Sequence, residues 1–497
     1  MVKVVVIGSG LGGLTCAYIL QRNGYDVTVL ERSAQIGGCL QSFLRGGVKF
    51  DTGMHVIGSA DEGQAMYGPL RYFGLADRVH LSRMDVSGYD TVSLCGECFR
   101  FPNGKEAFVE ALGGRFPKQR DNLRRYVDVV SRVASAQAFG SLNSSGHKWA
   151  MNVEYRTRSI DDVLCELFDD ELLRKVLVGN MPLYAAERGR TPFSLHAYVM
   201  DFYNQSAFRI VGGSDAIAQS LADSIREMGG HILVRKEAHR ICCDDTKATG
   251  VETVDECFYP SDYVISAVHP ARLLEMLDTK LIRPAFRSRL SGLRNTPGCF
   301  SLYVKFREGR MPYMNTNYFG YSVPSPWGCE RYTEAEWPKS FLYMHHCHED
   351  ASSFARSGVV LSYMNMEDVA RWKGTKVGHR GDDYEEFKRL HAERLIQEVE
   401  RHQPGFTSAI ESYYTSTPLT YLDYTGTEDG SMYGVSQDVA SDILTRVPYR
   451  TKVPNLLLAG QNVNSHGVMG VLTGTIVTCC ELVPPDKLQE QMSPPKW

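Results

Sequence analysis

The chain has 497 residues, enough for about two or three domains, and 43% apolar with 23% charged residues is typical of a globular protein. The net charge of −4 is small and dispersed, which argues against a nucleic-acid surface. No apolar run reaches about 18 residues, so no transmembrane helix is expected. Because the sequence begins almost directly in an apolar strand, we expect no signal peptide, a cytoplasmic location and reduced cysteines.

The start of the sequence carries its clearest motif. An apolar strand at 2–7 is followed by the glycine-rich turn 8–13, an apolar helix at 14–23, a second strand at 27–30 and then Glu31. This order is typical of a dinucleotide-binding βαβ unit, and the turn has the G-x-G-x-x-G spacing of that unit. The strand, the helix and the acid all stand where the motif requires them, so a dinucleotide ligand is predicted.

The three glycines of the motif and the acid after the second strand have separate structural roles. Gly8 permits the tight turn, Gly10 lets the backbone approach a pyrophosphate, and Gly13 lets the helix pack close to the strand. The positive end of the helix then faces the pyrophosphate. Glu31 is predicted to accept hydrogen bonds from ribose hydroxyls, which favours a cofactor without a 2′-phosphate. Arg32 follows directly and weakens this preference, because an arginine here can bind a 2′-phosphate. The unit alone fits both FAD and NAD.

The rest of the chain alternates helical and strand patterns. Expected helices span 62–77, 214–228 with Ser214 as N-cap, and 385–402, and the stretches 105–135 and 159–203 are expected to be mostly helical. Expected strands span 88–103 as a hairpin, 232–234, 238–243, 251–253, 263–267 and 455–459, the last running into a glycine-rich helix that ends near Cys480. Residues 297–366, rich in Tyr, Phe and Met, predict a mixed sheet.

Strands of dinucleotide-binding character therefore occur at the start, in the middle and at the end of the chain. The simplest arrangement is one nucleotide-binding domain of three segments, with a substrate domain inserted in two pieces. The nucleotide-binding segments are predicted at 1–75, 206–275 and 441–483, and the substrate-domain segments at 76–205 and 276–440. The proline-containing stretch 484–497 predicts a loose tail.

One cysteine pair has the spacing of a redox dithiol, and one His-Cys run contains metal-ligand residue types. The surrounding sequence argues against both interpretations. Cys95 and Cys98 lie between two strand-like stretches, as in a hairpin turn, whereas a redox dithiol usually begins a helix. In the run 345–348, His-His-Cys-His, neighbouring residues of a strand would point to opposite faces, and no second ligand pair has matching spacing. We therefore predict no metal site.

Several motifs together resemble the flavin amine-oxidase superfamily, and within it the branch of phytoene desaturases, carotenoid isomerases and retinol saturases. They are 8–13 with Glu31, 37–42, 50–55, 211–213, 229–232, 265–270, 417–434 and 455–474. The resemblance spans the chain, and 50–55 and 417–434 resemble the retinol saturases most. It implies an α/β fold in which a Rossmann-like FAD-binding domain, assembled from three chain segments, carries an inserted α+β substrate domain of mixed sheet and helices.

The resemblance also implies noncovalent FAD and a set of residues around it. These are Gly8, Gly10, Leu11, Gly12, Gly13, Glu31, Arg32, Gly38, Cys39, Ser42, Gly53, Met54, His55, Ala238, Ala267, Gly460, Gln461, Gly467, Val468 and Gly470. Gln461 departs from the Asp common in the superfamily and would hold the ribityl chain as a neutral amide. The helix beginning near 468–470 would point its N–H groups at the flavin. The sequence contains no second dinucleotide-binding motif that would support NAD(P) as an electron partner.

Three classes of function stay open at this point. The leading one is an FAD-dependent oxidoreductase acting on C=C bonds of an apolar isoprenoid or polyene, by saturation, desaturation or isomerisation. The second is an amine oxidase for a small amine, which needs an aromatic pair at the flavin and a polar pocket. The third is a flavin-binding protein without chemistry.

The chemistry adds its own expectations. His55, His466, Tyr421 and Asp423 are candidate acid/base groups, although hydride transfer to or from a polyene can proceed without a protein base. The aromatic stretch 297–366 would suit an apolar substrate tunnel. Since polyenes are nearly insoluble, we expect peripheral membrane contact through apolar side chains, persisting at high salt.

Overall fold

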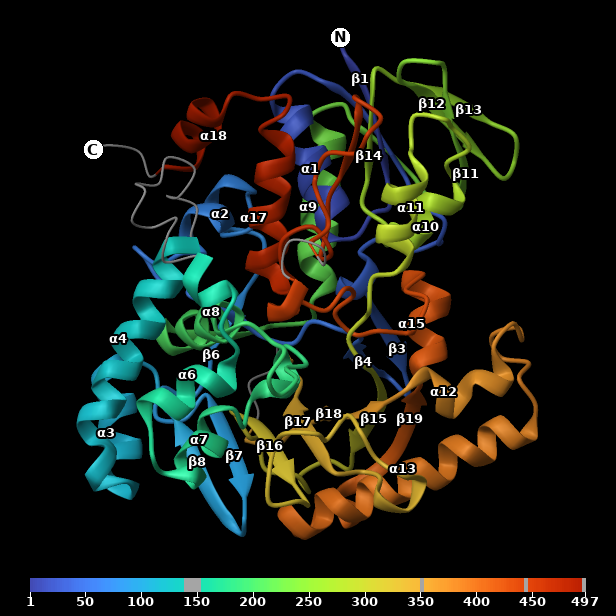
Figure 1. Ribbon diagram of the computed structural model, residues 1–497. Coiled ribbons are helices and arrows are strands. Elements are labelled where there is room, and N and C mark those ends of the chain that lie inside the picture. Colours follow the sequence, from blue (N-terminus) through green and yellow to red (C-terminus); the bar gives the residue numbers. More distant parts are fainter. Residues whose placement is uncertain (138–152, 349–352, 442–445, 494–497) are drawn as a thin grey trace.

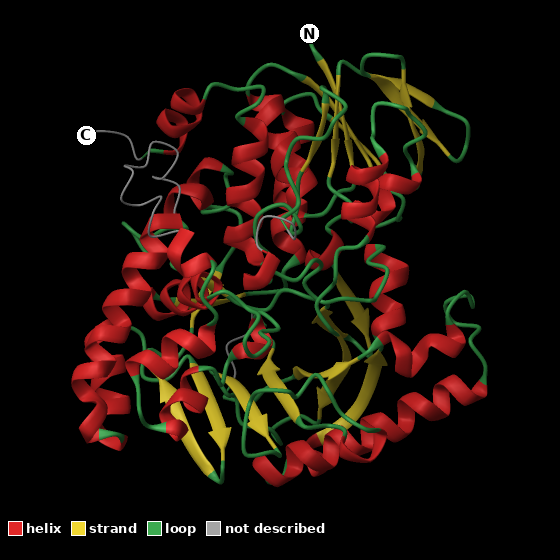
Figure 2. Ribbon diagram, viewed as in Figure 1, coloured by secondary structure: helices red, strands yellow, loops and turns green. Residues whose placement is uncertain are grey.

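The computed structural model describes residues 1–137, 153–348, 353–441 and 446–493. Its upper half in Figure 1 is built on a parallel sheet and its lower half on a mixed sheet, with helices on the outside of both (Figure 2). Segments distant in sequence meet in both halves, so neither half is one continuous stretch of chain.

The parallel sheet has five strands in the order β10–β2–β1–β14–β20, and every neighbouring pair is parallel. The strands are β1 (Lys3–Ile7), β2 (Asp26–Leu30), β10 (His231–Leu233), β14 (Tyr263–Ser266) and β20 (Leu456–Leu458). They come from the start, the middle and the end of the chain. The predicted Rossmann-like domain assembled from three segments is therefore confirmed, while the numerical domain boundaries stay predictions.

Both faces of this sheet are covered, which explains why β1 is apolar at successive positions. Val4 and Val6 pack into a core shared with three helices, whereas Val5 and Ile7 pack into a separate core on the other face. The helices of the first face lie side by side in Figure 1: α1 (Leu11–Arg22), α9 (Asp215–Glu227) and α17 (Gly467–Cys479). The second face carries β11 (Ala238–Cys243), β12 (Ala248–Thr253), β13 (Phe258–Pro260), α10 (Pro270–Glu275) and α11 (Pro284–Ser291).

The mixed sheet has seven strands in the order β19–β15–β18–β17–β16–β7–β8, and its β16–β7 pair is parallel while the other pairs are antiparallel. The strands are β7 (Asp90–Leu94), β8 (Glu97–Phe101), β15 (Gly298–Phe306), β16 (Asn317–Tyr321), β17 (Ser340–His345), β18 (Ser357–Met364) and β19 (Ile410–Ser416). The mixed sheet predicted for 297–366 is thus confirmed, as is the hairpin that turns at Cys95.

Helices cover both faces of the mixed sheet as well. On one face, α13 (Asp382–His402) packs over alternate residues such as Phe300, Leu302 and Val304. The other face meets a helical layer, which consists of α3 (Lys105–Arg115), α4 (Arg120–Gln137), α6 (Ile160–Leu167), α7 (Glu171–Leu177) and α8 (Phe193–Gln205). The remaining elements are β3 (Ser42–Arg45), β4 (Val48–Asp51), β5 (Ile57–Gly58), β6 (Leu81–Arg83), β9 (Ala207–Ile210), α2 (Tyr67–Tyr72), α12 (Met366–Val369), α14 (Phe406–Ala409), α15 (Pro418–Thr425) and α18 (Pro485–Met492).

One local prediction is wrong: the expected loose tail contains the helix α18, because Leu488 gives it a fully buried anchor. Ser214 is the N-cap residue of α9 as predicted, but its side chain makes no cap bond. Its Oγ instead binds the carbonyl of Leu40 and a carboxylate oxygen of Asp51. Thirteen free cysteines agree with the prediction of reduced thiols. Among the described residues, no helix is long and apolar enough to cross a membrane.

Candidate cofactor and substrate site

A cavity of about 560 Å³ lies where the strands of the parallel sheet end. Its wall includes the turn after β1, Glu31 after β2, Ala267 after β14 and Gly460 after β20. The carboxyl ends of parallel strands are where doubly wound sheets bind their ligands. Four chain segments that are far apart in sequence thus contribute to one site.

The glycines of the turn are required for different physical reasons. A Cβ on Gly13 would lie 1.9 Å from the carbonyl oxygen of Gly8, and one on Gly12 would lie 2.5 Å from Cα of Gly460. Close packing of α1 on its neighbours therefore excludes any side chain at these two positions. A Cβ on Gly10 meets no protein atom within 4 Å, although Gly10 lines the cavity. Only space for a ligand explains glycine at that position.

Glu31 is buried at the same end of the cavity, and the protein itself already orients its carboxylate. One oxygen accepts hydrogen bonds from the backbone N–H of Ser9 at 2.9 Å and from the Ser9 hydroxyl at 2.6 Å. The other oxygen accepts the N–H of Ser33 at 2.8 Å. A carboxylate has about four acceptor positions, so one remains for a ligand hydroxyl. Sequence reasoning missed Ser9, which ties the turn to Glu31.

The N-terminus of α17 faces the cavity from a third side. Gly467 and Val468 of its first turn line the wall, and no acidic residue occupies that turn. The positive end of the helix dipole is therefore available to a negatively charged or electron-rich group in the cavity. Gln461 lies in the wall just before this helix, with Asn462, whose side-chain oxygen accepts the N–H of Val435 at 2.9 Å.

The part of the wall that comes from outside the parallel sheet and its turns, called the apolar end below, includes Leu361 of β18, Tyr421 of α15, Met432 and Tyr433. The hydroxyl of Tyr421 donates to the carbonyl of Thr52 at 3.1 Å. Burial raises the pKa of Tyr421 and of Tyr433 above the ordinary range, so both phenols are neutral. A neutral phenol in an apolar surrounding can donate a proton or a hydrogen bond to a reacting group.

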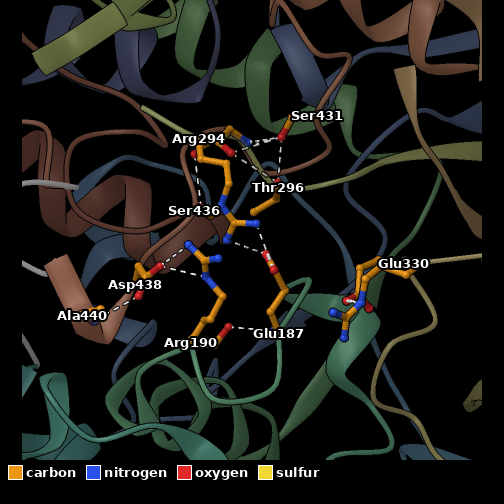
Figure 3. A network of polar contacts seen from close by, with 12 residues as sticks. Glu187, Arg190, Arg294, Thr296, Glu330, Ser431, Ser436, Asp438 and Ala440 are labelled. Atoms are coloured by element: carbon orange, nitrogen blue, oxygen red, sulfur yellow. Dashed lines mark hydrogen bonds and ion pairs between the residues drawn. The ribbon is translucent and has the colours of Figure 1, made fainter. Parts of the chain in front are cut away.

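A polar network fixes the loop that carries Tyr433 (Figure 3). The hydroxyls of Ser431 and Thr296 lie 2.7 Å apart, and Arg294 donates two hydrogen bonds, of 2.9 and 2.8 Å, to the carboxylate of Glu187. A two-pronged arginine–carboxylate contact restricts orientation as well as distance. The loop that carries Tyr433 is therefore held by Thr296, and the nearby Arg294 binds Glu187 from the first half of the chain.

Most of the predicted residues meet in this cavity. The wall contains Gly8, Gly10, Leu11, Gly12, Glu31, Arg32, Gly38, Cys39, Gly53, Met54, Ala238, Ala267, Tyr421, Gly460, Gln461, Gly467 and Val468. Wall residues that the sequence did not single out include Ser9, Gln41, Glu237, His269, Arg272, Thr425, Met432, Tyr433 and Asn462. Most of these lie within the recognised motifs, so the motifs located the right segments but did not single out every side chain.

Five predicted residues lie off the wall, and their assigned roles stay predictions. Gly13 and Gly470 serve packing, since a Cβ on Gly470 would lie 2.7 Å from the carbonyl oxygen of Ser465. Ser42 donates to a carboxylate oxygen of Asp51 at 2.8 Å. His55 and His466 are described below. Asp423, the fourth acid/base candidate, forms an ion pair with Arg380.

Neither candidate histidine lines the cavity, and both residues are half-buried. Burial lowers the pKa of His55 and of His466 to about 4, so both rings are neutral near pH 7. The ring of His466 stacks at 4.5 Å, centroid to centroid, against Tyr433, and His55 follows the wall residue Met54. Of the four acid/base candidates, Tyr421 is the one whose side chain lines the cavity.

Comparison with known proteins identifies the family. The family model described as flavin containing amine oxidoreductase matches residues 11–480. The chain belongs to this family. It therefore uses a flavin cofactor and is an oxidoreductase.

Individual relatives are more distant. Human all-trans-retinol 13,14-reductase is 27% identical over 519 residues, covering 95% of this chain and 84% of that protein. The chloroplastic prolycopene isomerase 2 of an Oncidium hybrid cultivar is 23% identical over 508 residues, covering 94% and 82%. The crystal structure of an oxidoreductase from Methanosarcina mazei superposes with a TM-score of 0.65 at 17% identity, covering 96% of this chain and 99% of that one. That likeness shows the shared fold.

Proposed function

We propose that this protein binds FAD noncovalently and transfers hydride to or from a C=C bond of an apolar isoprenoid or polyene. The observation that carries the proposal is the polarity of the cavity, which has a carboxylate and glycine turns at one end and aromatic and aliphatic side chains at the other. The names of the relatives, a retinol reductase and a prolycopene isomerase, support the polyene class.

The polar end suits the adenosine diphosphate half of FAD. Glu31 has an acceptor position for a ribose hydroxyl, and Gly10 with the N-terminus of α1 provides room and N–H groups for the pyrophosphate. Gln461 takes the ribityl chain through its amide. The N-terminus of α17 then lies at the isoalloxazine, where its dipole stabilises negative charge on the reduced ring.

The apolar end suits the substrate. A bound flavin supplies the hydride or accepts it, and the protein contributes orientation, exclusion of water and one proton donor or acceptor. Tyr421 is the wall residue with a titratable proton at that end, and the Thr52 carbonyl fixes its hydroxyl. Leu361 and Met432 present apolar surface, which leaves little in the described wall to bind an ammonium group near Tyr421.

An anaerobic assay tests the proposal. The flavin of the purified protein is reduced, a polyene such as all-trans-retinol or a carotene is added in detergent, and flavin absorbance is followed. A parallel sample of oxidised protein receives putrescine or benzylamine. Reoxidation by the polyene is expected and no reduction by the amines. Reduction by an amine, with no response to any polyene in either redox state, would replace the proposal by an amine oxidase.

Delivery of so apolar a substrate requires a membrane surface or a carrier. We propose peripheral membrane contact through apolar side chains, and Leu44 at the β3–β4 hairpin is 65% exposed. The net charge of −4 gives anionic lipid little to attract. Flotation with liposomes is therefore expected to be similar in low and high salt, and loss of flotation in high salt would show an electrostatic contact instead.

A further inference from the structure

Three ligand-type side chains from distant positions meet behind the cavity wall. Asp51 ends β4, His55 lies in the loop that follows, and His346 comes directly after β17 of the mixed sheet. One donor atom from each lies within 4.8 Å of the donor atoms of the other two. The hairpin β3–β4 lies between the two halves of the molecule in Figure 1, so the three residues join the halves.

The ring of His55 lacks the hydrogen-bond partners that a buried imidazole ordinarily has. Both ring nitrogens are buried, and neither has a hydrogen-bond partner in the described part of the chain. Leaving one buried polar atom unpaired costs about 1–3 kcal/mol, so a partner that the protein does not supply is expected. A neutral imidazole with a free lone pair is a metal ligand.

Nε2 of His346 is the unprotonated nitrogen of its ring, and an ion would have to displace one weak hydrogen bond to bind it. The backbone N–H of Asp51 points at Nε2 from 3.3 Å, so that nitrogen is the unprotonated one. The proton is then on Nδ1, which donates to the Ser357 hydroxyl at 3.2 Å. Metal-binding histidines ordinarily donate their other N–H to such a partner, which fixes the tautomer. The amide contact is long, and an ion would compete for the same lone pair.

Asp51 has the complementary arrangement. Its Oδ1 accepts three hydrogen bonds, from the Ser42 hydroxyl at 2.8 Å and from the N–H and hydroxyl of Ser214 at 2.8 and 3.0 Å. No described donor reaches its Oδ2 by a hydrogen bond, so that oxygen is available. Three such bonds hold the carboxylate in one orientation before any ion arrives.

We propose that Asp51, His55 and His346 bind a divalent transition-metal ion of the zinc or ferrous class. Two imidazoles and one carboxylate are a ligand set of catalytic zinc and of non-haem iron sites, with positions left open. Bonds of about 2.0–2.1 Å place donors roughly 3.3 Å apart, so the present spacing must close by at most about 1.5 Å.

The ion would brace the wall of the cavity from behind. The short loop between Asp51 and His55 contains Thr52, whose carbonyl holds Tyr421, and the wall residues Gly53 and Met54. Fixing both ends of this loop fixes those contacts. The proposal does not depend on the substrate, because metal content is measured without turnover.

Metal analysis of the flavin-loaded protein tests the site. The protein is incubated separately with Zn²⁺, Mn²⁺ and, without oxygen, Fe²⁺, desalted, and analysed by inductively coupled plasma mass spectrometry. About one tightly held ion of zinc or iron per chain is expected for the natural protein. The variant His346→Gln should lose it. The matched control is His345→Gln, because His345 is the buried neighbour whose nitrogens bind Met314 and Tyr343 instead.

A second variant, with a smaller change to the buried site, tests the proposal if His346→Gln fails to fold. Ser357→Ala leaves the three proposed ligands in place and removes the partner of Nδ1, together with a 2.9 Å contact to Nε2 of His348. Loss of such a partner of a ligating histidine lowers metal affinity by about 10–100-fold. Competition with a chelator measures that change while flavin absorbance and circular dichroism report on folding. Natural protein that retains no metal after loading, or a folded His346→Gln that retains as much as His345→Gln, would overturn the proposal.

Discussion

The two ends of the cavity are built in opposite ways. The polar end includes residues 8–12 and 30–32, which belong to one continuous βαβ unit. The apolar end gathers Met54, Leu361 and the pair Tyr421 and Tyr433 from three separate parts of the chain. Binding of the nucleotide half of a cofactor thus depends on backbone geometry, whereas the substrate end depends on long-range packing, and mutations at the two ends should fail differently.

The largest effect is expected within the glycine turn itself. Gly13→Val should abolish folding, because its Cβ would overlap the Gly8 carbonyl oxygen at 1.9 Å. Gly10→Val should fold with a near-normal circular dichroism spectrum yet stay colourless, since only ligand space is filled. Thermal melts and flavin absorbance distinguish the two variants. A yellow Gly10→Val protein would show that the flavin does not pass this glycine.

At the apolar end, Tyr421→Phe should slow turnover of a polyene by about a hundredfold while the flavin stays bound, because a proton donor is lost but the ring is kept. Tyr321→Phe is the matched control, a buried tyrosine whose hydroxyl donates to a backbone carbonyl away from the cavity at 2.7 Å. Stopped-flow flavin absorbance measures both. Equal rates for the two variants would show that the hydride step needs no tyrosine.

At the polar end, Glu31→Ala should weaken flavin binding by about tenfold to a hundredfold, the value of a hydrogen bond to a charged group. Because Glu31 also holds Ser9, the variant Ser9→Ala separates the two contributions. It removes one hydroxyl but leaves the carboxylate for the ribose. If Ser9→Ala weakens binding as much as Glu31→Ala in a fluorescence titration, Glu31 acts by shaping the turn and not by contacting the cofactor.

The smallest effect concerns pH. Burial lowers the pKa of His466 to about 4 in the folded protein, below its value of about 6.5 in the unfolded chain. The unfolded state therefore binds a proton first as pH falls, and stability declines between about pH 6.5 and 4. Removing this group by His466→Gln should reduce the slope there by up to about 1.4 kcal/mol per pH unit. Urea melts at pH 7 and 5 measure it, and an unchanged slope would place the titration elsewhere.

The contrast between the ends also explains what the sequence could predict. The βαβ unit, the three-segment domain and the mixed sheet followed from local periodicity and glycine spacing, and all are confirmed. Tyr433 was not singled out, because its position in the wall depends on contacts with Thr296 and Glu187 that no local pattern encodes.

The Asp51, His55 and His346 cluster likewise could not be predicted from local sequence patterns. The spacing of residues 345–348 argues against a metal site in that run, because neighbouring residues of a strand face opposite ways. The structure agrees that His345 and His346 have separate partners. It then brings two further ligand-type residues to His346 from a position 295 residues away along the chain. Spacing rules detect local ligand pairs and miss clusters formed by tertiary packing.

The close approach of Gly12 to Gly460 has a consequence for biosynthesis. The first cofactor turn packs, at van der Waals range and without intervening side chains, on a residue that is synthesised much later in the chain. The cavity wall also needs Gly467, Val468 and Val471. A nascent chain emerging from the ribosome therefore carries the recognition turn long before it has a pocket. Flavin capture is thus expected only after residues 460–471 have left the ribosome.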